Sequence, residues 1–192
     1  MFHASTSLPT TLLRGAAAGA AVSALALTAF AGPAAADAGV FRDQHGDVSV
    51  GADIERVRLV NDDTVRIRVT HRDLRRSWRS GSSISVFLDT DRQRSGPEYI
   101  FAGGTFEGSD YALQRAAGWR VADPQAEPMR CSYAMTLDYA TDVAAITIGR
   151  GCLGRPGAVR VAVRTGGESA AGVIERDWLG ERRELTPWVR RG

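Results

Sequence analysis

The 192-residue chain has no lysine, only two cysteines and only three histidines. All 24 basic residues are therefore arginine, a bias that we attribute to GC-rich codon usage rather than to mechanism. Two thiols without a nearby histidine cannot complete the tetrahedral shell of a zinc site. Paired metal-ligand histidines, a nucleophile elbow and a phosphate-binding glycine loop are also missing. His45 and His71 are predicted to be surface residues, and the sequence assigns no catalytic residue.

An excess of charge of one sign is missing as well. One basic residue and no acidic residue lie in 1–36, so residues 37–192 carry 23 arginines against 22 acidic residues, a net charge of +1. Binding to nucleic acid or to an anionic membrane surface requires a basic excess. The composition therefore argues against nucleic acid as a partner.

No apolar run reaches the length of about 20 residues that a transmembrane helix needs. The run at 16–31 is rich in alanine and ends at the helix-breaking pair Gly32-Pro33. The small residues at 34–36 are typical of a signal peptidase cleavage site. We therefore predict a cleaved signal peptide at 1–36 and a secreted, extracellular domain at 37–192 without a membrane anchor.

Cys131 and Cys152 are the only cysteines. In an exported protein a single pair is most simply one disulfide. The closed loop of about 20 residues corresponds to roughly 3 kcal/mol of stabilisation in the chain-entropy model. The two cysteines lie just outside a predicted hairpin, which the disulfide would hold closed.

Short apolar segments with alternating polarity predict strands. Val65, Ile67 and Val69, for example, share one face while two arginines occupy the other. The expected strands are 54–60, 65–69, 83–88, 99–102, 111–115, 119–121, 133–137, 143–148, 159–163 and 184–189. Turn residues separate them throughout, which predicts an all-β fold, a single antiparallel β-sandwich of immunoglobulin-like or jelly-roll type.

Four arginines, Arg72, Arg75, Arg76 and Arg79, have the spacing of one helical face. A short helix there would favour a bound anion, because the four charges repel one another. The alternative is a solvated connection between two strands.

The loop after the strand 83–88 is a candidate cation site. Asp89 and Asp91 alternate along it, and Glu98 or Asp110 could complete a set of oxygen ligands for Ca²⁺. Arg94 stands where the helix-loop-helix calcium loop requires glycine, which excludes that motif. The alternative is that the two aspartates accept hydrogen bonds from backbone amides and shape the turn.

Four tryptophans offer flat surfaces for stacking on carbohydrate. Trp78, among serines and arginines, is the most exposed by this pattern and is the candidate ligand-binding residue. Trp119, Trp178 and Trp188 are predicted to pack inside the domain.

Several motifs resemble those of known proteins. They are Ser85 to Asp91, Gly96 to Tyr99, Asp110 to Leu113, Gly118-Trp119, Cys152 to Pro156, Asp177-Trp178 and Thr186 to Val189. Together they resemble a group of small secreted actinobacterial proteins. The strand followed by Asp89-Thr90-Asp91 is more distantly similar to family 9 carbohydrate-binding modules and to DOMON domains. That resemblance implies a ligand-binding sandwich without catalytic activity.

The leading functional hypothesis is therefore a non-catalytic, extracellular binding module for a glycan or a similar ligand. An interaction or structural protein of the cell envelope is the alternative, and a secreted hydrolase is a third class. Partners would be a polysaccharide or an envelope component, and Ca²⁺ is the one cofactor with candidate ligands. The sequence does not indicate an oligomeric state.

Overall fold

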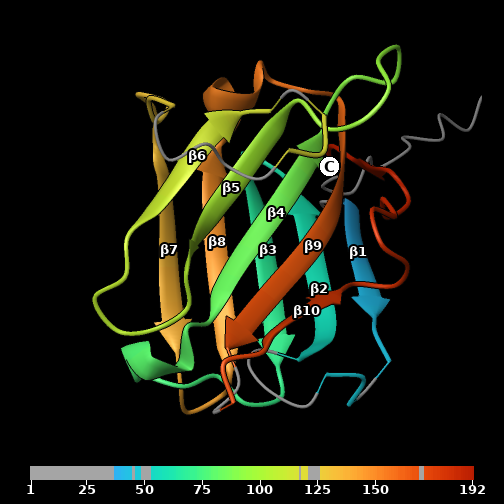
Figure 1. The fold of residues 1–192 in the computed structure, drawn as a ribbon. Helices are drawn as coiled ribbons and strands as arrows, with labels where there is room; N and C mark the ends of the chain where they lie inside the picture. The colour runs from blue at the N-terminus through green and yellow to red at the C-terminus, as the bar shows by residue number, and fades with distance from the viewer. Residues whose placement is uncertain (1–36, 45, 49–52, 117, 121–125, 169–170) are drawn as a thin grey trace, which may run out of the picture. The chain divides into compact units, whose positions relative to one another are not determined.

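Two antiparallel sheets pack face to face in the computed structural model (Figure 1). The structure describes residues 37–192 except 45, 49–52, 117, 121–125 and 169–170, so the predicted signal peptide lies outside the described residues. The first sheet has the order β1 (Asp37–Arg42), β2 (Ile54–Asn61), β3 (Thr64–His71), β8 (Val143–Gly149) and β7 (Tyr133–Asp138). The second has the order β10 (Ile174–Trp178), β9 (Ala158–Glu168), β4 (Ser83–Asp89), β5 (Tyr99–Gly104) and β6 (Tyr111–Arg115), and β11 (Val189–Arg190) also pairs with β9. The predicted all-β sandwich is confirmed.

The core lies between the two sheets and follows the alternation of the strands. Val65, Ile67 and Val69 of β3 are 0% exposed, as the sequence pattern predicts. Val86 and Leu88 of β4 face them from the second sheet and are equally buried. Branched aliphatic side chains suit this arrangement because they pack well on pleated surfaces.

The disulfide between Cys131 and Cys152 is present, with 5.7 Å between the two Cα atoms. Cys131 precedes β7, and Cys152 lies in η2 (Arg150–Leu153), the short 3₁₀ helix that follows β8. The link therefore joins the two ends of the β7–β8 hairpin, as predicted. It is consistent with an oxidising compartment.

Several expectations are wrong or incomplete. Trp119 lies outside any strand, and only Val189–Arg190 of the expected final strand is paired. The strands β1 and β10 carry no strong alternation and were not expected. His71 is 1% exposed, because it continues the inward series of β3, whereas His45 lies outside the described residues.

The helical face of four arginines does not form. The only helix in this connection is η1 (Trp78–Ser80). Arg72 lies 3.8 Å from a carboxylate oxygen of Asp53, and Arg75 pairs with Asp73 at 2.5 Å. These separate acidic partners favour the solvated connection over an anion site.

Arginines cover the outward face of the first sheet. Arg42 is opposite Arg56 in the β1–β2 register, and Arg58 is opposite Arg68 in the β2–β3 register. All four side chains are exposed, as is Arg66 on the same face. Arg66 pairs with Asp62 at 3.2 Å, whereas the like charges of the Arg42–Arg56 and Arg58–Arg68 pairs repel one another.

Candidate functional site

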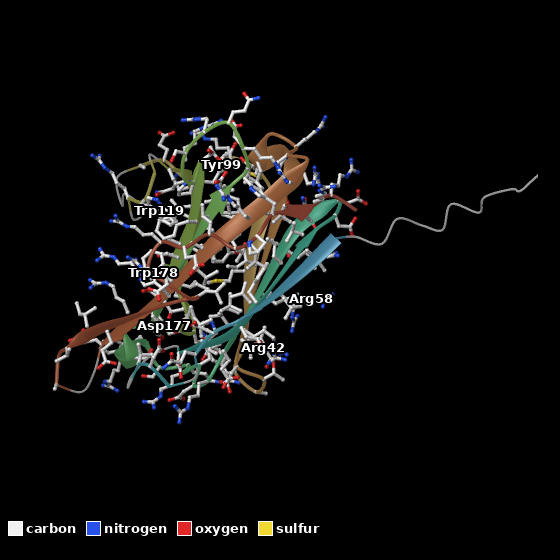
Figure 2. The ribbon with its side chains drawn as sticks, turned by 90° about the vertical axis from the view of Figure 1, so that its right-hand side faces the viewer. Arg42, Arg58, Tyr99, Trp119, Asp177 and Trp178 are labelled. Atoms are coloured by element: carbon white, nitrogen blue, oxygen red, sulfur yellow. A yellow bond between two sulfur atoms is a disulfide. The ribbon has the colours of Figure 1, made fainter. Side chains whose placement is uncertain are left out.

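The outward face of the second sheet carries a second apolar cluster. Phe87, Ile100 and Ala162 form its buried part, and Trp119 and Trp178 pack against it. Figure 2 shows the two tryptophans on the side of the molecule away from Arg58. The second sheet is therefore covered on both faces, which explains why nearly every residue of β4 is buried.

The aromatic rings pack against one another in fixed orientations. The rings of Phe87 and Trp178 are stacked, with centroids 5.7 Å apart and an interplanar angle of 13°. Trp119 is tilted against Phe87 at 5.4 Å and against Trp178 at 6.3 Å. Both tryptophans remain half-buried, so part of each indole is accessible to a ligand.

A cavity of about 470 Å³ opens beside these two tryptophans. Its other lining side chains are all arginines, namely Arg164 of β9, Arg176 of β10, and Arg182 and Arg183 of the loop that follows β10. Cavities of this size are typical of small-ligand sites. Within the described part of the chain, no acidic side chain lines the cavity and no salt bridge involves these arginines.

Arg164 is the most constrained of the four arginines. Its guanidinium donates to Ser85 Oγ at 3.2 Å, and its Cζ lies 5.8 Å from the centre of the Trp178 ring. Burial lowers the pKa of Arg164 below its ordinary value, and the positive charge of Arg176 lowers it further. An arginine keeps its charge even so, so the cavity concentrates positive charge with few compensating groups.

A second cavity of about 260 Å³ adjoins the first, because both are lined by Arg164 and Arg176. It extends along β9 and β10 to Gly81, the residue that ends η1. The two cavities lie next to each other on the outward face of the second sheet, over β9 and the edge strand β10. Glu168 also lines the second cavity, so the positive charge is concentrated in the first.

Trp78, the ligand-binding candidate of the sequence, is 67% exposed, as expected. The guanidinium of Arg79 lies 5.2 Å from its ring centre. Trp78 does not line either cavity on this face. Its role in binding stays a prediction.

The structure places the three predicted calcium ligands in different surroundings. Asp89 is 0% exposed, and one of its oxygens accepts two hydrogen bonds from Arg160, at 2.8 and 2.6 Å. Asp91 accepts from the backbone N–H of Gln93 at 2.9 Å, and Asp110 is exposed at the start of β6. Among the described residues these three do not form a group of converging ligands, whereas Asp43, Asp47 and Asp177 do.

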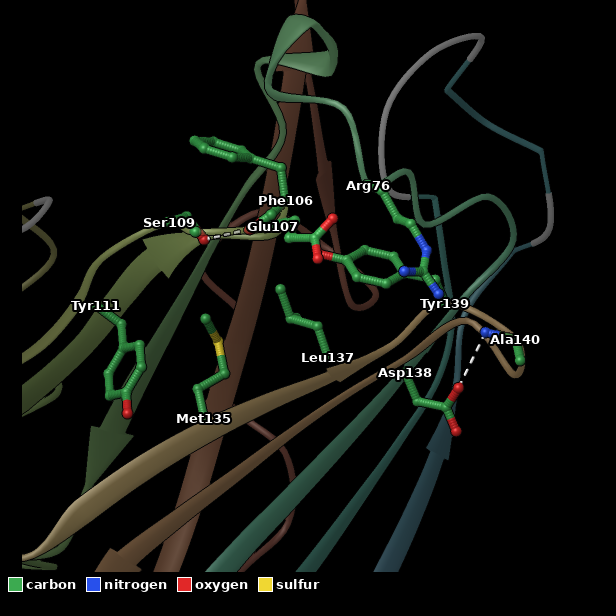
Figure 3. A pocket seen from close by; sticks show the side chains of 11 residues that line it. Arg76, Phe106, Glu107, Ser109, Tyr111, Met135, Leu137, Asp138, Tyr139 and Ala140 are labelled. Carbon is green, nitrogen blue, oxygen red and sulfur yellow. Dashed lines mark hydrogen bonds between the residues drawn. The ribbon is translucent and has the colours of Figure 1, made fainter.

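A further cavity, of about 440 Å³, lies at the opposite edge of the sandwich (Figure 3). Tyr111 of β6 and Met135 and Leu137 of β7 line it, together with Tyr139 of the following turn. Arg76 stacks over the Tyr139 ring at 5.0 Å from its centre. Because β6 and β7 are the end strands of their sheets, this cavity lies at the edge of the sandwich, where the segment between the two strands also donates a backbone hydrogen bond from Met129 to Leu113 of β6.

No protein-family model matches the chain, and no curated protein sequence matches it. Among the described residues, no helix has the length and apolar character needed to cross a bilayer.

The arginines of the cavity escaped sequence reasoning because they belong to segments that fold together only in space. Arg164 alternates with inward-facing valines in β9, which is a visible signal of an outward position. Arg176 and Trp178 are two residues apart in β10 and therefore share a face. The short polar segment that contains them gave no reason to expect a strand.

Proposed function

We propose that this protein is a secreted binding module for an anionic glycan, held on the outward face of the second sheet. The observation that carries the proposal is the cavity formed by Trp119 and Trp178 and by four arginines without acidic partners in the described chain. The signal peptide predicted at 1–36 and the disulfide support an extracellular location.

The chemistry of the cavity favours an acidic sugar. Indole rings provide flat apolar surfaces on which a sugar ring stacks. Guanidinium groups bind carboxylate, sulfate or phosphate with two parallel hydrogen bonds. A ligand that offers both a ring face and an anionic group uses both kinds of side chain at once.

The test compares two double variants that remove the same charge. Arg176→Ala/Arg182→Ala removes two arginines from the cavity, and Arg58→Ala/Arg68→Ala removes two exposed arginines from the outward face of the first sheet. Binding to polygalacturonate, dextran sulfate and uncharged dextran is measured at physiological salt. We expect at least about a tenfold loss of affinity for an acidic polymer in the cavity variant, since hydrogen bonds to charged groups contribute roughly 1.5–3 kcal/mol each.

The affinity of the control variant for the acidic polymers should fall less than about twofold, because salt screens exposed surface charges. Equal losses in the two variants would mean that the polymer binds through general positive charge, contrary to the proposal. Retention on uncharged dextran alone, or on none of the three polymers, would also contradict it.

The cavity in Figure 3 supports the alternative, an interaction protein of the cell envelope that binds a partner beside β6 and β7. Ala140 is exposed at the rim of that cavity. This alternative predicts that Ala140→Arg removes association with isolated cell envelopes while Arg176→Ala/Arg182→Ala leaves it unchanged. The opposite pattern supports the glycan proposal.

A further inference from the structure

Four aspartates meet where the β1–β2 connection approaches the edge strand β10. Asp43 follows β1, Asp47 lies in the connection, Asp53 immediately precedes β2, and Asp177 belongs to β10. One oxygen from each of Asp43, Asp47 and Asp177 lies within 4.8 Å of the other two. Figure 2 shows Asp177 next to Trp178, the last residue of β10. These residues come from both sheets and are up to 134 positions apart.

Asp177 is deeply buried and only half satisfied. Its side chain is 3% exposed, and its Oδ2 accepts a hydrogen bond of 2.6 Å from the backbone N–H of Ile54. Its Oδ1 is buried and has no hydrogen-bond partner. An unsatisfied buried carboxylate oxygen is costly. Because the protein supplies no donor to this oxygen, the oxygen indicates a binding site for a ligand.

Two neighbouring carboxylates repeat the pattern. Asp53 is 4% exposed, and its Oδ2 accepts from the N–H of Gly46 at 2.9 Å while its Oδ1 has no partner. Asp43 accepts from the N–H of Gly180 at 2.9 Å through Oδ1, and its buried Oδ2 has no partner. Each of the three aspartates thus accepts from backbone N–H groups and has one buried oxygen without a hydrogen-bond partner.

Positive charge near these carboxylates is scarce. Within the described residues, the only salt bridge to the group joins Arg72 to Asp53 at 3.8 Å. Burial, followed by the negative charges of Asp43, Asp47 and Asp53, raises the pKa of Asp177 to about 7. Burial likewise raises the pKa of Asp43. Asp43 and Asp177 therefore lie where a nearby positive charge is favourable.

We infer that Asp43, Asp47 and Asp177 bind a divalent cation, with Ca²⁺ as the best match. Two oxygens that each lie about 2.4 Å from one Ca²⁺ are at most about 4.8 Å apart, which fits the spacing of the three carboxylates. The ligands are hard oxygen donors, which select Ca²⁺ or Mg²⁺ over the metals that prefer sulfur or imidazole. Ca²⁺ tolerates the irregular geometry of a loop and a strand better than Mg²⁺ does.

A cation there would join the β1–β2 connection of the first sheet to β10 of the second. Strand β10 also carries Arg176 and Trp178, which line the glycan cavity on its other face. The cation site itself does not depend on the proposed glycan function, and its test requires no glycan.

The test is a Ca²⁺ titration of the full chain, followed by calorimetric unfolding and by isothermal titration calorimetry. We expect one bound ion and a melting temperature that rises by about 3–10 °C at 10 mM Ca²⁺ and returns with chelator, as for extracellular sites of 0.1–1 mM affinity. Mg²⁺ at the same concentration should give a smaller shift.

Variants separate this site from other sites. Asp177→Asn should melt no lower than the wild type in chelator, because it removes a buried charge, and should lose the Ca²⁺ shift. Asp43→Asn, at a half-buried position, should weaken Ca²⁺ binding at least about tenfold and provides the same test if Asp177→Asn does not fold. Asp63→Asn, in the exposed β2–β3 turn, is the matched control and should keep the full shift.

Three results would overturn the inference. The first is no Ca²⁺ shift in the wild type, and the second is an undiminished shift in both Asp177→Asn and Asp43→Asn. The third is a shift that disappears in Asp91→Asn but persists in Asp177→Asn, which would place the ion in the loop after β4.

Discussion

Replacing Asp89 by asparagine removes a negative charge from a position that water does not reach. Asp89 is 0% exposed, and its Oδ2 receives hydrogen bonds from two nitrogens of Arg160, at 2.8 and 2.6 Å. The Arg160 side chain is 29% exposed, and its guanidinium lies 4.5 Å from the centre of the Trp188 ring. The variant leaves this guanidinium half-buried and without its partner.

The expected loss of folding free energy follows from removing only one partner of this ion pair. Breaking a buried ion pair by removing one partner costs about 3–5 kcal/mol, and the lower end applies because Arg160 can partly recover water. For a domain of this size, a loss of about 3 kcal/mol lowers the melting temperature by about 6–12 °C. Urea unfolding followed by tryptophan fluorescence gives the free energy, and calorimetry gives the melting temperature.

A double-mutant cycle with Arg160→Met identifies the cause. The double variant should be more stable than Asp89→Asn alone, because it leaves no unpaired charge. Asp91→Asn, two residues further on and partly exposed, should lose less than about 1 kcal/mol. A loss in Asp89→Asn no larger than in Asp91→Asn, or simple additivity in the cycle, would refute the assignment of Asp89 to the Arg160 pair.

Three further outcomes are expected. Replacing both cysteines by serine should cost about 3 kcal/mol in urea unfolding, and reduction of the wild type should have the same effect. Gly103→Ala should cost about 1–3 kcal/mol, because a Cβ there would lie 2.6 Å from Cβ of Tyr111, whereas Gly157→Ala, with nothing within 4 Å, should be nearly neutral. In chelator, stability should fall as pH rises from 3.8 to about 7, since over this range the Asp177 carboxyl holds its proton when folded and loses it when unfolded. A pH profile without that decline, or one that Asp177→Asn does not flatten, would contradict the environment described for Asp177.

The sequence predicts the elements whose pattern is local and misses those that depend on distant partners. The hairpin of β2 and β3 is visible because Val65, Ile67 and Val69 alternate with polar residues. The strands β1 and β10 are not visible, because their segments are short and half polar and become strands by pairing with β2 and β9.

The candidate site shows the same division. The exposure of Trp78 follows from its polar neighbours in sequence. The convergence of Asp43 with Asp177, or of Trp119 with Arg176, depends on which strand ends meet across the sandwich, and no spacing in the sequence encodes that. The sequence predicts a cation site at Asp89 and Asp91 because the two residues are close in the chain. In the structure, Asp89 instead pairs with Arg160 on the adjacent strand β9.

The arginine pairs on the outward face of the first sheet also disfavour self-association through that face. The described residues leave this face exposed, so two copies could stack on it. Here, stacking would bring the guanidinium groups of Arg42, Arg56, Arg58 and Arg68 in one copy against the same groups in the other. The long aliphatic parts of these side chains shield the sheet from water, while their charges keep a second copy away. The protection depends on ionic strength, because salt screens exposed charges beyond about 10 Å at 0.1 M.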